Sequence, residues 1–225
     1  MIGGIVAQMG GSDCESIGTG VFAQPINTVS SLAYTVIGVF VLGWAFAVSG
    51  RERTYRLVFG VLMGSTGIGS VLFHGPQIGT SQFTHDVTFL VTLWFLAVGN
   101  LADRFQWSST RRWTVTVVGS VAVAATLLLS PPTTNVVMVV GVLVLVTSDV
   151  LLRRHGRVVS MWFVASFITI GLAVVMFLLG RTGSPLCDPG AFFQGHAVWH
   201  LLGAVSLGSY FVGTSHARLD PTQEK

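Results

Sequence analysis

Charged residues are scarce in this chain. Only 9% of its 225 residues are Asp, Glu, Lys or Arg, whereas 51% are hydrophobic. An ordinary soluble domain carries about 25% charged residues. Apolar stretches recur along the sequence, each close to the length needed to cross about 30 Å of hydrocarbon. The composition therefore excludes an ordinary water-soluble domain and predicts a protein embedded in a lipid bilayer.

Separate modules and charged patches are also missing. No Pro/Ser-rich linker interrupts the chain, so we expect residues 1–225 to form a single domain. The net charge of +3 is spread over short segments and forms no patch, so we expect no nucleic-acid partner. The first fifteen residues contain no Lys or Arg, which excludes a typical signal peptide. The excess of Arg over Lys, with abundant Val, Ala and Gly, favours a bacterial cell membrane.

Turn and charge signals divide the apolar sequence into seven spans. The short fourth and fifth spans are separated by the turn at Ser130-Pro131-Pro132. We therefore expect an all-α, polytopic membrane protein with seven transmembrane helices. The predicted spans are Val29–Val48, Tyr55–Phe73, Phe83–Leu101, Trp113–Leu129, Val136–Leu152, Val158–Leu179 and Phe193–Val212.

Basic residues are distributed unevenly between alternate loops. Cytoplasmic loops retain positive charge, so the loops rich in Lys and Arg are expected inside. One set of loops contains only Arg181. The N-terminus is therefore predicted outside and the C-terminus in the cytoplasm. The other set contains Arg51, Arg53, Arg56, Arg104, Arg111, Arg112, Arg153, Arg154, Arg157, Arg218 and Lys225.

Ionisable side chains in or beside the spans are candidates for function, because a charge is costly in hydrocarbon. The predicted topology brings four of them to the outer boundary, at the end of the second span and at the starts of the third and seventh. These four are His74, Asp86, His196 and His200. The active site is therefore expected near the outer face of the membrane.

Spacing adds a second constraint. His196 and His200 are four residues apart and so project from one face of a helix, and Ser70 and His74 repeat this spacing on the second span. Three neutral imidazoles that leave one coordination position open form a well-known type of catalytic zinc site. The sequence thus predicts a metal site formed by His74, His196 and His200.

Simpler roles remain for several of these residues. The alternative for His74 is a cap at the end of its helix. His85 is either a ligand or a solvated side chain, and because we expect it in a loop at the interface, we favour solvation. Asp149 lies near the inner end of the fifth span, where we expect a structural ion pair with Arg153 or Arg154.

Five short motifs follow one another along nearly the whole chain. They are Asp13-Cys14-Glu15, Asn27-Thr28-Val29-Ser30-Ser31, Ser70-x3-His74, Asp86 and His196-x3-His200. In order, membrane depth and spacing, this set resembles the alkaline ceramidases, within the larger CREST group of seven-helix membrane hydrolases. The resemblance implies Zn²⁺ bound by the three histidines, with Ser70 and Asp86 assisting hydrolysis of the amide in a ceramide-like lipid.

The same resemblance concerns the N-terminal segment. It implies a disulfide between Cys14 and Cys187, both predicted in outer segments, where disulfides persist. It also implies a calcium ion, for which the segment offers few hard oxygen ligands beyond Asp13 and Glu15. The alternative is a structural role, in which Glu15 and Asn27 hold this segment against the helices by hydrogen bonds.

The expected function is that of a zinc-dependent hydrolase that cleaves an N-acyl sphingoid or related N-acyl lipid from the bilayer. Asp86 is expected to transfer the proton and Ser70 to hydrogen-bond the oxyanion. One alternative is a receptor-like protein resembling the adiponectin and progestin receptors, which have the opposite orientation. The other is a transporter or channel, but the middle of most spans is Val, Leu, Ala and Phe, which disfavours an ion path.

Overall fold

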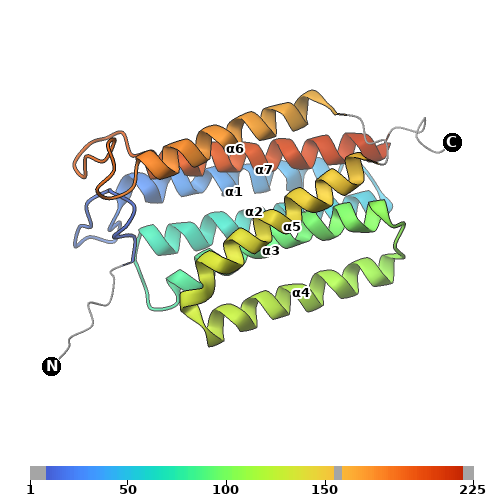
Figure 1. Ribbon diagram of the computed structural model, residues 1–225, viewed down its shortest axis with the longest axis horizontal. Helices are drawn as coiled ribbons and strands as arrows, with labels where there is room; N and C mark the ends of the chain where they lie inside the picture. The colour runs from blue at the N-terminus through green and yellow to red at the C-terminus, as the bar shows by residue number, and fades with distance from the viewer. Residues whose placement is uncertain (1–8, 155–158, 220–225) are drawn as a thin grey trace.

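The protein is all-helical in a computed structural model that describes residues 9–154 and 159–219. No β-strand occurs within those two ranges. A short 3₁₀ turn, η1 (Pro131–Thr133), connects the fourth helix to the fifth. The seven α-helices, labelled in Figure 1, are α1 (Pro25–Ala45), α2 (Gly50–His74), α3 (Ser81–Arg104), α4 (Ser109–Leu129), α5 (Thr134–Arg153), α6 (Met161–Leu179) and α7 (Gly195–Leu219).

Each predicted span overlaps one of these helices. Six of them, α1 to α6, are long and apolar enough to cross a bilayer. The 25-residue α7 packs lengthwise between α1 and α6. The chain is therefore built as an integral membrane protein. Of the basic residues used to predict its orientation, Arg157 and Lys225 lie outside the described residues.

Several helices begin before the predicted apolar spans. α1 starts at Pro25, which suits the first turn because its missing N–H needs no partner there. α2 starts at Gly50, and its first turns carry the ion pair between Glu52 and Arg56. A hydropathy criterion excludes the polar and charged residues of these first turns. The predicted spans therefore mark the apolar part of each helix and miss its polar ends.

The first two helices approach each other closely because glycines meet at their crossing. A Cβ atom on Gly38 of α1 would lie only 2.7 Å from the carbonyl oxygen of Gly60 on α2. Small residues are common at such contacts between membrane helices, since they let the backbones approach. The close packing brings Ser31 of α1 to within 2.8 Å of Ser70 on α2, measured between their hydroxyl oxygens.

An aromatic core holds together α2, α3 and α7. Phe211 of α7 stacks on Phe59 of α2 with ring centroids 3.9 Å apart. Tyr55 stacks on Phe211 at 5.5 Å and on Phe95 of α3 at 4.5 Å. Aromatic pairs of this kind contribute about 0.5–1.5 kcal/mol beyond the burial of their area. The core therefore fixes the three helices that carry the histidines.

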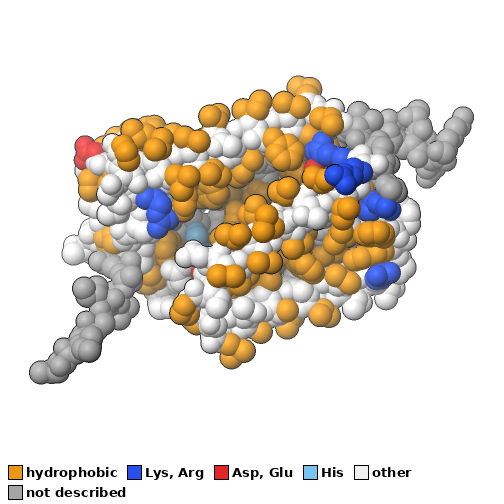
Figure 2. All heavy atoms as spheres, viewed as in Figure 1, with side chains coloured by type: hydrophobic (Ala, Val, Ile, Leu, Met, Phe, Trp, Pro, Cys, Tyr) orange, Lys and Arg blue, Asp and Glu red, His pale blue; other side chains and the backbone are white. Residues whose placement is uncertain are grey.

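The helices form an open arc in which α5 and α6 occupy different edges. α6 packs on α7, whereas α5 packs on α3, and the described parts of α5 and α6 make no extensive contact with each other. The surface of α4, α5 and α6 is largely apolar, as Figure 2 shows. Figure 2 also shows a hollow between the two edges, with a histidine side chain visible in it.

The two ends of the bundle carry different polar residues, histidines at one end and arginines at the other. The histidine end comprises the end of α2 at His74, the starts of α3 and α7, and the segments 9–24 and 180–194. The opposite end, here called the arginine end, comprises the ends of α3 and α5 at Arg104 and Arg153 and the start of α2. Figure 2 shows most of the visible basic side chains at the arginine end.

Candidate metal centre

Three histidines from two distant parts of the chain meet at the histidine end. His74 is the last residue of α2, and His196 and His200 lie in the first two turns of α7. The ring centroid of His74 is 5.0 Å from that of His196 and 5.0 Å from that of His200, and the latter two are 4.6 Å apart. All three side chains are buried. The structure thus brings together the three residues that the sequence predicted as ligands.

Hydrogen bonds engage one nitrogen of His74 and one of His200, and neither nitrogen of His196. His74 Nδ1 is 2.7 Å from Gln24 Oε1, and His200 Nδ1 is 2.9 Å from the hydroxyl of Ser30. Within the described residues, the Nε2 atoms of all three histidines have no hydrogen-bond partner. A buried nitrogen without a partner costs about 1–3 kcal/mol. Metal-binding histidines typically hold one ring nitrogen by an outer partner and present the other to the ion.

A carboxylate faces the third histidine. Asp13 Oδ1 lies 3.5 Å from His196 Nδ1, longer than a normal hydrogen bond. Burial raises the pKa of Asp13 above its usual value, while the hydroxyl of Ser12 and the charge of Arg181 act in the opposite direction. Asp13 therefore lies beside the histidine cluster, in addition to the structural role expected from the sequence.

Two sets of donor atoms in the described residues are close enough to hold a metal ion. One set is Asp13, His74 and His196, and the other is His74, His85 and His200; within each set the donor atoms lie within 4.8 Å of one another. Both sets contain His74. Tetrahedral zinc with bonds of about 2.0–2.1 Å needs donors about 3.3 Å apart, so the rings must draw together around an ion. Neither set contains His74, His196 and His200 together; we consider these three as one group because their rings adjoin and their buried Nε2 atoms lack a hydrogen-bond partner among the described residues, as does His196 Nδ1.

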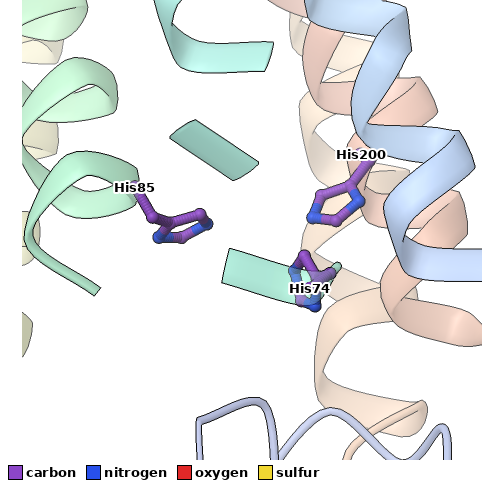
Figure 3. A group of neighbouring side chains, drawn as sticks. All are labelled: His74, His85 and His200. Atoms are coloured by element: carbon purple, nitrogen blue, oxygen red, sulfur yellow. The ribbon is translucent and has the colours of Figure 1, made fainter. Parts of the chain in front are cut away.

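The structure corrects the expectation for His85. This residue lies within α3, which begins at Ser81, and not in a loop. Its ring centroid is 6.1 Å from that of His74, and Figure 3 shows its side chain directed across the site toward His74 and His200. Only part of the side chain is exposed, because Phe73 packs against it at 4.7 Å. His85 therefore belongs to the site and is not simply a solvated interface residue.

Asp86 is buried and held by three donors. Its Oδ2 accepts a hydrogen bond from Gln82 at 2.7 Å and from the hydroxyl of Thr134 at 3.2 Å. Its Oδ1 is 2.8 Å from His85 Nδ1. Thr134 is the first residue of α5, so this carboxylate also fixes α5 against α3. Asp86 reaches the histidine cluster through the ring of His85, which the sequence alone did not indicate.

Ser70 lies one turn below His74 on α2 and is buried. Its hydroxyl is 2.8 Å from that of Ser31, which donates to the carbonyl oxygen of Asn27 and lies 3.4 Å from His200 Nδ1. Because Ser31 uses its one hydroxyl proton on Asn27, the Ser70 hydroxyl is the donor in the bond between the two serines. The structure therefore positions a hydroxyl beside the histidine cluster, as the spacing predicted.

The N-terminal segment is fastened over this site. Cys14 is disulfide-bonded to Cys187, as predicted. The two carboxylate oxygens of Glu15 accept hydrogen bonds from the backbone N–H groups of Ile26 and Asn27, both at 2.8 Å. Glu15 thus caps the start of α1, where a negative charge is favourable. The predicted structural role of Glu15 and Asn27 is consistent with these contacts, although Asn27 contributes its backbone and not its carboxamide.

Gln24 occupies the region where the resemblance implied calcium. Its side-chain nitrogen donates to the backbone carbonyl oxygens of Gly10 and Glu15, both at 2.9 Å. Both carboxylate oxygens of Glu15 also accept backbone hydrogen bonds. Among the described residues, the two metal-capable sets do not include Glu15. These hydrogen bonds hold the segment against the start of α1.

Two further residues lie where the sequence suggested. Asp149 forms an ion pair with Arg153 at the arginine end, far along the helices from the histidines. Trp199 packs against Phe177 of α6 with ring centroids 5.2 Å apart. Both therefore have packing or structural partners outside the metal centre.

Sequence reasoning missed the side chains that orient the histidines. Gln24 and Ser30 are 50 and 170 residues away from the rings they contact. Ser30 belongs to a motif that was singled out, but nothing in its spacing indicates His200 as its partner. Gln82 precedes Asp86 by one helical turn, and this i, i+4 spacing is the one signal that could have predicted a contact.

A scan of the chain against models of known protein families finds no match, and a search of curated proteins finds no similar sequence. The functional interpretation therefore depends on the residues of the site and their geometry.

Proposed function

We propose that this protein is a zinc-dependent amide hydrolase of the membrane that cleaves an N-acyl lipid to a free fatty acid and an amine. The observation that carries the proposal is the set of three buried histidines on α2 and α7 whose rings adjoin and whose Nε2 atoms have no partner among the described residues. The motif resemblance to the alkaline ceramidases points in the same direction.

The donor set suits zinc. Three imidazole nitrogens and one open position match catalytic zinc sites, whereas calcium and magnesium prefer oxygen ligands. His74, His196 and His200 would hold the ion through Nε2, with Gln24 and Ser30 fixing two of the rings. A bound zinc ion would supply Lewis-acid polarisation of the amide carbonyl and a water that ionises near neutral pH.

The surrounding side chains supply the proton transfer. Asp86 is oriented by Gln82 and Thr134 and paired with His85, whose ring faces the histidine cluster. In hydrolysis the C–N bond breaks, the water's oxygen joins the acyl carbon and a proton must reach the leaving nitrogen. The Asp86–His85 pair is suited to accept the proton from water and to return it to the amine.

A hydroxyl next to the cluster completes the set. Ser70 lies one turn below His74, and its oxygen is held at 2.8 Å from that of Ser31. Rotation of the Ser70 O–H away from Ser31 would let it donate to the negative oxygen that develops on the acyl carbon. Ser70 is therefore assigned as the oxyanion donor.

Access from the bilayer supports a lipid substrate. The hollow between α5 and α6 opens on an apolar face of the molecule, and a histidine side chain is visible in it (Figure 2). A chain of hydrocarbon can enter such an opening without crossing water. The amide of a membrane lipid would then lie at the histidine end while its acyl chain extends between the helices.

The proposal includes the orientation with seven spans, an outer N-terminus and the site at the outer face. Accessibility labelling of single cysteines introduced at Gln77 and Arg53 tests this orientation in intact cells. The first should react with a membrane-impermeant reagent and the second should not. Labelling in the reverse sense contradicts the orientation and favours the receptor-like alternative.

The decisive experiment combines metal analysis with an activity assay. Detergent-purified protein should contain about one equivalent of zinc and release fatty acid from an N-acyl sphingoid lipid, as measured by mass spectrometry. Removal of zinc by a chelator should abolish the release, and readdition should restore it. Zinc-loaded protein that is inert on a full panel of N-acyl lipids contradicts the proposal.

A further inference from the structure

A second buried polar cluster, at the arginine end, has no part in the proposed reaction. Asp149 of α5 is almost fully buried and accepts a hydrogen bond from the hydroxyl of Tyr210 at 3.0 Å. The side-chain amide of Asn100 donates to the Tyr210 oxygen at 2.6 Å and to the Ser148 hydroxyl at 3.1 Å. The other oxygen of Asp149 binds the guanidinium of Arg153. These contacts join α3, α5 and α7.

Arg153 extends this cluster to α6. The central carbon of its guanidinium lies 4.0 Å from the ring centroid of Phe163 and 5.5 Å from that of Phe167, both on α6. Stacking of a guanidinium on aromatic rings is favourable, and more so when the charge is partly buried. Because α5 and α6 otherwise make no extensive contact in their described parts, this stack closes the space between them at the arginine end.

The space above the stack is apolar and open. Helical spacing puts the residues two and three turns before Arg153, and those one and two turns after Phe167, on the same faces as these two side chains. A Cβ atom added to Gly171 would meet no atom within 4 Å. The residues concerned are Val142 and Val146 of α5, which are exposed, and Gly171 and Val174 of α6.

The length of this space matches one lipid chain. On α7, Tyr210 follows His200 by ten residues, which corresponds to about 15 Å along a helix. The hydrocarbon core of a bilayer is about 30 Å thick, so the acyl chains of one leaflet extend about 15 Å. A lipid with its amide at the histidines would reach the Arg153 stack with the end of a chain of that length.

We propose that the Asp149–Arg153 cluster is the end stop of an acyl-chain groove between α5 and α6 and sets the longest chain the protein accepts. Binding of an acyl chain depends only on the groove. Selection among the lipids that are hydrolysed rests on the proposed function. A chain that is too long meets the guanidinium of Arg153, which is held by Asp149, and Asp149 is in turn held by Tyr210. Each methylene that does not fit is expected to cost roughly tenfold or more in discrimination.

Two substitutions move the limit in opposite directions. Gly171→Leu fills the groove from α6 without a clash and replaces glycine by a better helix former, so the variant should fold. Arg153→Lys retains the ion pair with Asp149 but loses the planar stack on Phe163 and Phe167. Gly43→Leu is the matched control, because Gly43 of α1 is an equally open helical glycine away from the groove.

Native mass spectrometry with an equimolar series of fatty acids, from short to very long chains, measures binding without requiring turnover. Wild type should show a sharp upper limit in bound chain length. Gly171→Leu should shift the limit to shorter chains and Arg153→Lys to longer chains, with at least tenfold changes in the ratio of long to short chains bound. Gly43→Leu should match wild type.

The same series, offered as N-acyl sphingoid lipids, separates the two proposals. A chain-length limit in binding without hydrolysis of any N-acyl lipid contradicts the proposed function but supports the end stop. Hydrolysis with the same chain-length profile in wild type, Gly171→Leu and Arg153→Lys contradicts the end stop alone. Absence of any fatty-acid binding, with a second copy or another protein occupying the groove, also overturns the end stop.

Discussion

The two ends of the bundle both bury polar side chains, but they differ in the chemistry of the atoms left without a partner. At the arginine end, Asn100, Tyr210 and Asp149 donate and accept among themselves, and the unpaired atoms among the described residues are guanidinium nitrogens and hydroxyls, which do not form a zinc site. At the histidine end, the Nε2 atoms of His74, His196 and His200 have no partner among the described residues. A satisfied network stabilises a fold, whereas converging unsatisfied atoms indicate a missing ligand. The contrast assigns structure to one end and chemistry to the other.

The largest effect is expected from removing a ligand. His196→Ala leaves two imidazoles in place of three, so zinc content should fall to background and fatty-acid release should stop. Elemental analysis of the purified variant and the release assay measure both. Thr126→Ala, on the exposed face of α4, is the control and should behave as wild type. Full zinc content in His196→Ala would remove this residue from the ligand set.

The next effect concerns Asp86. Asp86→Asn keeps the hydrogen-bonding shape but cannot accept and return a proton, so turnover should fall by about 10²–10⁴-fold while zinc stays bound. His85→Gln should show a smaller loss in the same assay, because the carboxylate remains. Unchanged turnover in Asp86→Asn would overturn the assignment of the proton-transfer residue.

Ser70→Ala should reduce turnover by about 10²-fold, the typical cost of one lost oxyanion donor. Zinc content should be unaffected, because Ser70 contacts Ser31 and none of the histidine nitrogens in the described structure. Ser31→Ala is a second test variant, because it removes the hydroxyl that holds Ser70 in position. Equal rates for Ser70→Ala and wild type would assign Ser70 to packing only.

A smaller effect is expected from an orienting residue. Gln24→Leu removes the acceptor of His74 Nδ1 and should weaken zinc affinity by about 10–100-fold, as observed for outer partners of metal-binding histidines. Competition with a fluorescent zinc chelator measures this shift. Gln24→Glu keeps the acceptor for His74 but, like Gln24→Leu, loses the two amide hydrogen bonds to Gly10 and Glu15, so wild-type affinity in Gln24→Glu alone would assign the effect to the orientation of His74. No shift in either variant would contradict the role.

The smallest effect on the metal is expected at the arginine end. Tyr210→Phe removes the hydrogen bond to Asp149 and leaves a buried carboxylate less well satisfied, at a cost of about 1–3 kcal/mol. The thermal midpoint in detergent should fall, while zinc content and affinity stay at the wild-type values. Loss of zinc in Tyr210→Phe would show that the two ends are coupled and would break the contrast drawn between them.

Periodicity and topology were sufficient to predict much of this arrangement. Seven helices and the Ser130-Pro131-Pro132 turn follow from runs of apolar residues, and the i, i+4 pair of His196 and His200 follows from helical geometry. To predict that His74 lies near this pair, it was enough to assume that helix ends at the same membrane depth lie near each other. These features depend on local sequence and on the thickness of the bilayer.

The rest depends on contacts between distant segments and on helix rotation. Adjacent residues of a helix point about 100° apart, so the sequence could not tell whether His85 or Asp86 faces the histidines. Gln24 reaches His74 because the segment before α1 folds back over the site, held by Glu15. Neither fact has a periodic signal in the sequence.

Synthesis of this chain must be nearly complete before its three-histidine cluster exists. The disulfide joins residues 173 positions apart, and two of the three clustered histidines lie on α7. A nascent chain that has inserted α1 to α6 contains only one of the three, His74. Cys187 lies between α6 and α7, so the partner of Cys14 is made before the last two histidines. The disulfide can therefore anchor the N-terminal segment before α7 completes the cluster beneath it.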